Sequence, residues 1–122
     1  MNINEYSPLV LAYLGDCVIE LAVREKLVRS GNIPPERLHD KALLFVTASN
    51  QSKAIENILP LLTETETEIY KRGRNAKSRA PKSASAIDYR RATGMECLFG
   101  YLYLLDNKNR IKELFDIAFG DI

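Results

Sequence analysis

Histidine and cysteine are scarce in this sequence of 122 residues: His39 is the only histidine, and Cys17 and Cys97 are the only cysteines. A single histidine excludes a histidine-rich zinc site. The two cysteines lack CxxC spacing and lie in apolar helical patterns, so we expect free, buried thiols in a reducing cytoplasm. For His39 we expect a structural contact near a helix start rather than a chemical role.

Long apolar runs are missing as well, since no stretch reaches the roughly eighteen uninterrupted apolar residues of a membrane span. The opening residues, MNINEYSPLV, lack a basic stretch followed by an apolar one, so no secretory signal is expected. No segment shows the alternation of a β-strand. The length suits one domain, and 46% apolar and 27% charged residues are ordinary for a globular protein. We therefore expect a single cytoplasmic all-α domain spanning residues 1–122.

Helical periodicity and its breaks predict the elements. Ser30-Gly31 is a usual helix end, and a proline such as Pro35 suits a first helical turn. Thr63 and Glu66 have the spacing of a capping box. Residues 74–87 read as the one long polar loop. The predicted helices span about 9–29, 35–46, 49–59, 63–73, 89–105 and 109–119.

Charge is distributed unevenly along the chain, although the net charge is only +1. Residues 71–91 contain eight Lys or Arg and one acid, which makes this segment +7, whereas the rest of the chain is −6. A basic stripe on an acidic body indicates a local anionic partner. The alternative is a solvated basic loop that binds nothing.

Two acids stand out because they lie within apolar helices. Asp16 belongs to the helix at 9–29 and Glu96 to the apolar stretch 92–105. A buried carboxylate is costly unless it is paired or bound to a cation, and the small residues Gly15, Gly94 and Gly100 would let two helices approach closely. Two such carboxylates predict a shared Mg²⁺, or Mn²⁺, since oxygen ligands suit these ions.

Simpler explanations exist for each acid. Asp16 could be solvent-exposed near a helix end. Glu20 has the spacing of a surface ion pair with Arg24, which we expect to form. Glu96 could pair with one of two neighbouring bases, Arg90 or Arg91.

Four segments, taken together, resemble the ribonuclease III family. They are LAYLGDCVIELAVREKLV, which is similar to the family's signature helix, TGMECLFGYLYLLD, which is similar to its second acidic motif, the middle helix LHDKALLFVTASNQS, and KRGRNAKS at 71–78. The strongest likeness is to the short bacterial branch called Mini-ribonuclease III, whose members lack a double-stranded-RNA-binding domain. The resemblance implies the helical endonuclease-domain fold and, with the chain ending at Ile122, no such second domain.

The resemblance also implies an activity, namely metal-dependent cleavage of double-stranded or structured RNA that leaves 5′-phosphate and 3′-hydroxyl ends. The substrate implied by the branch is the precursor of 23S ribosomal RNA. Asp16 and Glu96 match the family's catalytic, metal-binding acids. Two further family acids are replaced by Ala12 and Thr93, which leaves the number of metal ions open. A scaffold domain that binds RNA without cutting it is the main alternative, and a helical protein-interaction module is a weaker one.

The matching motifs also imply contacts with RNA and with a second copy of the chain. Tyr13 matches an aromatic that packs into the partner protomer of the family's homodimers, although it could equally be a core tyrosine. Asn75 and Ser78 are expected to reach ribose 2′-hydroxyls. The expected phosphate contacts are Lys71, Arg72, Arg74, Lys77 and Lys82.

Overall fold

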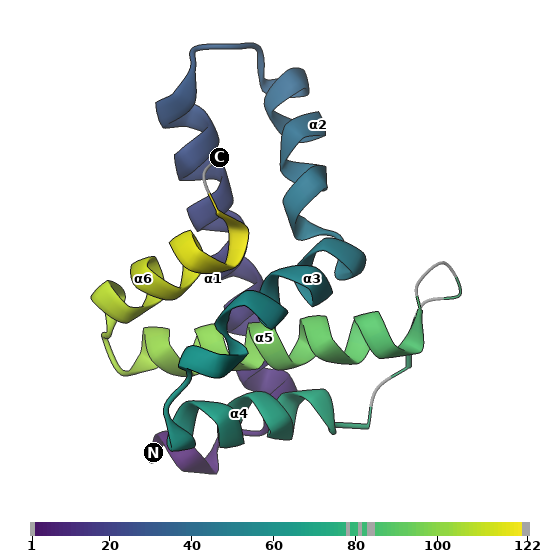
Figure 1. Ribbon diagram of the computed structural model, residues 1–122, viewed down its shortest axis with the longest axis vertical. Helices are drawn as coiled ribbons and strands as arrows, with labels where there is room; N and C mark the ends of the chain where they lie inside the picture. The colour runs from purple at the N-terminus through teal and green to yellow at the C-terminus, as the bar shows by residue number, and fades with distance from the viewer. Residues whose placement is uncertain (1, 78, 81, 83–84, 121–122) are drawn as a thin grey trace.

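Six α-helices build the described part of the chain, which comprises residues 2–77, 79–80, 82 and 85–120 of a computed structural model (Figure 1). No strand occurs among these residues, so the predicted all-α class is confirmed. Short 3₁₀ turns at Ile3–Glu5 and Leu59–Leu61 complete the order. The helices are α1 (Pro8–Ser30), α2 (Pro35–Val46), α3 (Ala48–Ile58), α4 (Glu64–Arg74), α5 (Ala86–Leu104) and α6 (Lys108–Phe119).

Side-chain caps decide where these helices begin. The Thr63 hydroxyl accepts the Glu66 amide at 3.1 Å and the Glu66 carboxylate accepts the Thr63 amide at 2.9 Å, so the predicted capping box is present. Helix α5 begins three residues before the predicted start, because the Ser85 hydroxyl caps the Asp88 amide. The third helix was predicted to run on to Pro60, but α3 ends at Ile58 and Pro60 lies in the 3₁₀ turn.

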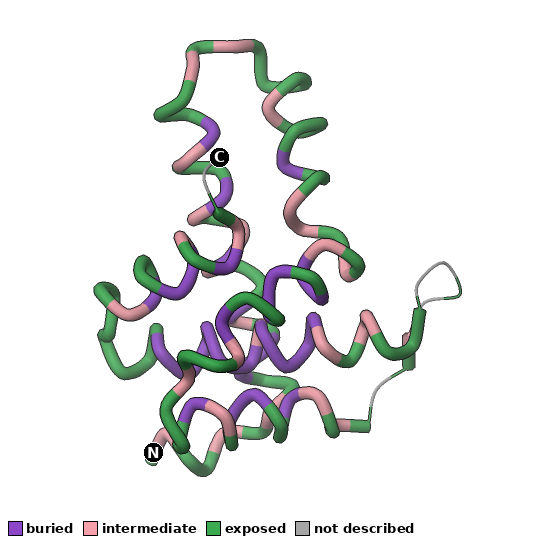
Figure 2. The backbone as a smooth tube through the Cα atoms, viewed as in Figure 1, coloured by how far each residue is buried: buried purple, intermediate pink, exposed green. Residues whose placement is uncertain are grey.

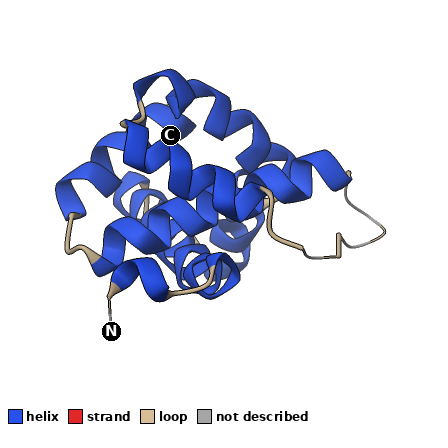
Figure 3. Cartoon of the chain, turned by 90° about the horizontal axis from the view of Figure 1, so that it is seen from below, coloured by secondary structure: helices blue, strands red, loops and turns tan. Residues whose placement is uncertain are grey.

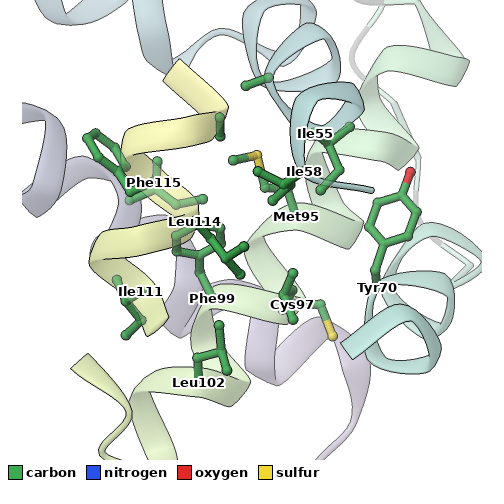
Figure 4. Packing of buried hydrophobic residues seen from close by; sticks show 14 of the residues in the cluster. Ile55, Ile58, Tyr70, Met95, Cys97, Phe99, Leu102, Ile111, Leu114 and Phe115 are labelled. Atoms are coloured by element: carbon green, nitrogen blue, oxygen red, sulfur yellow. The ribbon is translucent and has the colours of Figure 1, made fainter. Parts of the chain in front are cut away.

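Helix α5 is the centre of the molecule and packs against α1, α3, α4 and α6. All of its residues from Ala92 to Leu102 except Glu96 are buried, and Figure 2 shows this part of the tube as mostly buried. Figure 4 shows side chains of α5, including Met95 and Phe99, gathered with those of the surrounding helices. A helix that is apolar all round is expected to be central, and α5 confirms this for residues 92–102, whereas Tyr103, Leu104 and Leu105 are exposed.

Glycines let α1 cross α5 in close contact. A Cβ atom on Gly100 would lie 2.0 Å from the Leu11 carbonyl oxygen, and one on Gly15 would meet the Glu96 backbone. A glycine also allows close contact between α4 and α5, because a Cβ on Gly73 would lie 2.9 Å from the Gly94 Cα. Backbone therefore meets backbone at both crossings, and this fixes α1 and α4 against the central helix (Figure 3).

The sequence of α1 is apolar around most of the helix, which predicts burial on most sides. The structure differs from this prediction. The C-terminal half of α1 extends beside α2 as a protruding hairpin (Figure 1). The side chains along one face of α1 are exposed. Cys17 lies on this face, so the expectation of a buried thiol there is wrong, whereas Cys97 is buried as expected. Burial raises the pKa of the Cys97 thiol to about 11. The exposed apolar side chains of the face are Leu9, Val10, Tyr13, Leu21 and Val28.

Candidate active site

The crossing of α1 and α5 brings the carboxyl groups of Asp16 and Glu96 together. Burial raises the pKa of the Glu96 carboxyl to about 8, and the charge of Asp16 and a hydrogen bond with it add to the rise. The two acids come from distant parts of the sequence, and the glycine contacts of the crossing hold their backbones in place. A coupled pair of carboxyls at a rigid helix crossing is the most chemically distinctive feature of the described residues.

Asp16 and Glu96 are less buried than the sequence predicted. Asp16 is exposed, although it lies in the middle of α1 rather than near a helix end, and Glu96 is only partly buried. The pattern did not reveal this because α1 is apolar on most sides, so the sequence does not say which side is covered. A half-open pair can be reached by a ligand from solvent, which a fully buried pair cannot.

The surroundings of the pair suit a hard divalent cation. A carboxyl whose proton affinity is raised by burial and by a neighbouring carboxylate, as that of Glu96 is, is relieved when a cation replaces its proton. No group of three or more His, Cys, Asp or Glu side chains with metal-binding geometry occurs among the described residues, so the protein would supply Asp16 and Glu96 alone. Mg²⁺ commonly retains several waters and binds through one or two carboxylates, so this donor set fits it.

The replacements of the two family acids lie beside this pair without adding charge. Ala12 is buried in α1 one turn before Asp16. Thr93 is buried in α5, and its hydroxyl donates to the Tyr89 carbonyl at 2.9 Å. The proton of that hydroxyl is therefore used within the helix, and only its oxygen lone pairs remain for a ligand.

A groove of about 630 Å³ opens beside Glu96 between α5 and the junction of α2 with α3. Its α5 side carries Thr93 and Glu96, and its other side carries Thr47, Ser49 and Gln51. Of the described residues that line it, Asp88 and Glu96 carry carboxyl groups and none is a Lys or Arg. Motif matching named none of the α3 residues as contacts, although they lie in the middle-helix segment that resembled the family.

Of the simpler explanations for the acids, the Glu20–Arg24 ion pair is confirmed and the pairing of Glu96 with Arg90 or Arg91 is wrong. Glu20 pairs with Arg24 at 2.8 Å, as expected. Glu96 pairs with neither neighbouring base, since Arg91 binds Glu56 of α3 at 2.9 Å and the Arg90 Nε donates to the Ala86 carbonyl. Glu96 is therefore not paired with either base, and its charged neighbour is Asp16.

The expected RNA contacts fall at the end of α4 and in the loop that follows. Arg72 reaches back to the Tyr6 carbonyl at 3.4 Å, and the Arg74 guanidinium stacks 5.6 Å from the centre of the Tyr70 ring. The Arg74 Nε also donates to the Asn75 side-chain oxygen. Ser78 lies outside the described residues. The exposed members of the set are Lys71, Arg72, Asn75, Lys77 and Lys82.

Three further basic residues join this region in space. Arg79 and Arg90 line a shallow hollow of about 530 Å³ with Asn75 and Lys77, and Arg91 lines a second one with Arg74. These residues were counted in the +7 segment but lay outside the motif. The second hollow, which Arg91 lines together with Ile87, lies away from the Asp16–Glu96 pair. Ile87 is two and a half helical turns from Glu96 and therefore faces the opposite side of α5.

Tyr13 and His39 occupy open surfaces. The Tyr13 side chain is 86% exposed on α1, so it is not a core tyrosine. His39 lies on α2, one turn after the helix start, and lines a hollow of about 370 Å³ between α1 and α2. Neither residue takes part in the Asp16–Glu96 pair.

Comparison with known proteins identifies the family of the chain. The family model of the ribonuclease III domain matches residues 9–107. The chain therefore belongs to the ribonuclease III family, whose members are endoribonucleases that generally depend on a divalent metal and act on double-stranded RNA.

Individual relatives narrow this to one branch, that of Mini-ribonuclease 3. The Mini-ribonuclease 3 of Symbiobacterium thermophilum is 45% identical over 91% of this chain and 86% of its own length. That of Brevibacillus brevis is 44% identical over 96% and 88%. A crystal structure of a protein from Fusobacterium nucleatum superimposes with a TM-score of 0.86, at 34% identity, over 95% of this chain and 93% of that one.

The search for membrane-spanning segments found no candidate among the described helices: none combines the length and apolar character that crossing a bilayer requires.

Proposed function

We propose that this endoribonuclease cuts double-stranded RNA at the Asp16–Glu96 pair with Mg²⁺, or Mn²⁺, as its cofactor. The meeting of the two acids at the α1–α5 crossing, where Gly15 lies against the Glu96 backbone and Asp16 raises the pKa of Glu96, is the observation that carries the proposal. Asp16 and Glu96 are the residues that would hold the ion. When bound, such an ion lowers the pKa of a coordinated water and neutralises charge on the phosphate that is attacked.

The protein itself contributes the fixed positions of the two carboxyl groups. The backbone contact at Gly15 fixes the spacing of α1 and α5, so the two carboxyls are held on rigid helices rather than loops. The raised pKa of Glu96 means that this carboxyl keeps its proton at neutral pH until a cation or substrate displaces it. The products would carry 5′-phosphate and 3′-hydroxyl ends.

Binding of the duplex is assigned to the basic region that follows α4. Its exposed cations would contact phosphates, and Asn75, with Ser78, would contact 2′-hydroxyls. Arg72, Arg74 and Asn75 have defined partners in the fold, which supports a partly ordered platform at this end of the region. Lys71, Lys77 and Lys82 are exposed and would supply charge.

The assembly we propose is a homodimer through the open apolar face of α1. Tyr13 lies on that face, beside Asp16 in sequence, and its exposure in a single chain supports an interface position. Two copies joined there would present two catalytic pairs to one duplex, one for each strand. The substrate we propose is a precursor of ribosomal RNA, specifically that of 23S.

A cleavage assay tests the activity. Wild-type protein should cut a perfect RNA duplex with Mg²⁺ and not with EDTA, and the Asp16→Asn variant should bind the duplex but leave it intact. Because Asp16 is exposed, this variant should fold normally, which circular dichroism can verify. Cutting by folded Asp16→Asn at the wild-type rate would reject the site. Binding without cutting by the wild type would favour the scaffold alternative.

A second assay tests the substrate. Ribosomal RNA ends are mapped in cells that lack the protein and in cells that carry Asp16→Asn. Precursor ends of 23S ribosomal RNA should accumulate in both. Mature 23S ends in both strains would exclude this substrate.

A further inference from the structure

Gln51 lies in the groove beside Glu96 and has an unused hydrogen-bond acceptor. Its side chain is 2% exposed, and its Nε2 donates to the Val46 carbonyl at 3.1 Å, which secures the end of α2. Its Oε1 has no partner among the described residues. A buried amide oxygen without a partner is costly, so an unpaired one beside an active site calls for an explanation.

The lining of the groove limits what could pair with this oxygen. Asp88 and Glu96 contribute carboxyl groups, and no Lys or Arg of the described residues lines the groove, so binding of a phosphate is unfavourable there away from a metal ion at the catalytic pair. The partner must also be a donor, because an amide oxygen only accepts. A neutral hydroxyl satisfies both conditions.

The start of α3 offers the complementary donors. The Asn50 amide is capped by the Thr47 hydroxyl and the Gln51 amide bonds to the Thr47 carbonyl. The amides of Ala48 and Ser49, at the first two positions of the helix, have no intrahelical carbonyl to bind. A hydroxyl in the groove can thus donate to Gln51 and accept from the first turn of α3.

We infer that Gln51 accepts a hydrogen bond from a ribose 2′-hydroxyl of the RNA strand that lies in this groove. The inference rests on the proposed function and adds a specificity residue to it. The 2′-hydroxyl is the donor and acceptor that RNA has and DNA lacks, so Gln51 would select RNA next to the catalytic pair. The terminal torsion of a glutamine has a broad minimum, so a small rotation that keeps the Nε2 hydrogen bond to Val46 can turn Oε1 toward the groove.

Binding to modified duplexes tests the inference. Single 2′-deoxy and 2′-fluoro substitutions are placed in turn around the cut site, and affinity is measured with Ca²⁺ in place of Mg²⁺. At one position both substitutions should weaken wild-type binding by roughly three- to ten-fold, the range of one neutral hydrogen bond. Gln51→Met should bind the unmodified duplex that much more weakly and be insensitive to substitution at that position alone.

The matched control is Asn57→Leu, which removes another side-chain amide of α3. Asn57 donates to the Ala118 carbonyl at 2.9 Å and does not line the groove. This variant should keep the full sensitivity to 2′-substitution. Equal sensitivity of wild type and Gln51→Met at every position would overturn the inference while leaving the proposed function intact. Failure of the wild type to bind or cut any duplex would overturn the proposed function itself.

A measurement on the wild type keeps the test independent of how the variant folds. Gln51 is the only glutamine of the chain, so glutamine labelled with ¹³C at its side-chain carbonyl gives one signal. That signal should shift when the unmodified duplex is added and should stay near its free position with the duplex that is 2′-deoxy at the sensitive position. The same shift with both duplexes would show that the 2′-hydroxyl is not its donor.

Discussion

A Cβ atom added to Gly15 would lie 1.6 Å from the backbone carbonyl oxygen of Glu96. No side-chain rearrangement can relieve such an overlap, because the obstructing atom belongs to the backbone of α5. The residue before one of the two proposed catalytic acids therefore touches the backbone of the other, and the spacing of the two helices is coupled directly to the geometry of the pair.

Gly15→Ala should consequently separate α1 from α5. We expect a loss of stability above the ~1–3 kcal/mol typical of overpacking, together with loss of cleavage, since the two carboxyls move apart. Urea unfolding and the cleavage assay measure the two effects. Gly31→Ala is the control, because nothing lies within 4 Å of a Cβ there, and it should change stability by less than about 0.5 kcal/mol. A Gly15→Ala protein with wild-type stability would contradict this packing.

Glu96 should make the metal-free protein less stable as pH rises. Its folded pKa of about 8 lies above the ordinary 4.5, so between these values the folded state binds more protons than the unfolded state and stability falls with pH. Glu96→Gln removes this titration and should gain stability relative to wild type across the same range. Thermal unfolding in EDTA from pH 4.5 to 9 measures it.

Two other carboxyls, those of Glu66 and Asp116, have a lowered pKa, so their effect on stability has the opposite sign and occurs at lower pH. It can therefore be distinguished from the effect of Glu96. A hydrogen bond from Arg110 lowers the pKa of Glu66, and the ion pair with Lys26 lowers that of Asp116. Their stabilising contributions are present above their ordinary pKa values and are lost as pH falls below them. A constant stability difference between wild type and Glu96→Gln from pH 4.5 to 9 would reject the raised pKa.

Tyr13→Ala should weaken the proposed dimer. An aromatic anchor at the centre of an interface typically contributes roughly 2 kcal/mol or more, so dissociation should become at least about thirty-fold easier. Sedimentation equilibrium of the wild type at micromolar concentration should give about twice the chain mass of 13.8 kDa, and the variant should shift toward the monomer. Leu61→Ala, which truncates an exposed apolar residue of the 3₁₀ turn before α4, should leave the wild-type mass unchanged. A monomeric, active wild type would exclude the dimer.

Arg74→Ala with Lys77→Ala should reduce the salt dependence of duplex binding. Each lost phosphate contact should make the slope of log affinity against log salt shallower by roughly 0.7–0.9, and the effect should be alike for different sequences. Stability should change little, because Lys77 is exposed and Arg74 gives up only its stacking on Tyr70 and an exposed hydrogen bond to the neighbouring Asn75 side chain. Lys108→Ala with Lys112→Ala removes the same charge from exposed positions of α6 and serves as the control. Equal slopes for the two double variants would show that the loop is merely solvated.

Local sequence determined the helices and most of their ends. The capping box at Thr63 and Glu66 and the break at Ser30-Gly31 act within one or two turns, so they can be recognised without knowing the rest of the fold. The two candidate acids were also identifiable, because each interrupts an apolar pattern and matches a family motif. Glycines at 15, 94 and 100 indicated close helix approach, which the crossings confirm.

Tertiary structure alone decided which side of each helix is covered. Helix α1 is apolar on most sides, so its periodicity could not place Asp16 at the surface, expose Cys17 or leave Tyr13 on an open face. The meeting of Asp16 with Glu96, the pairing of Arg91 with Glu56 and the unpaired amide oxygen of Gln51 each depend on the packing of α5 against other helices. Such contacts join residues far apart in the chain, and no local pattern of hydrophobicity or charge encodes them.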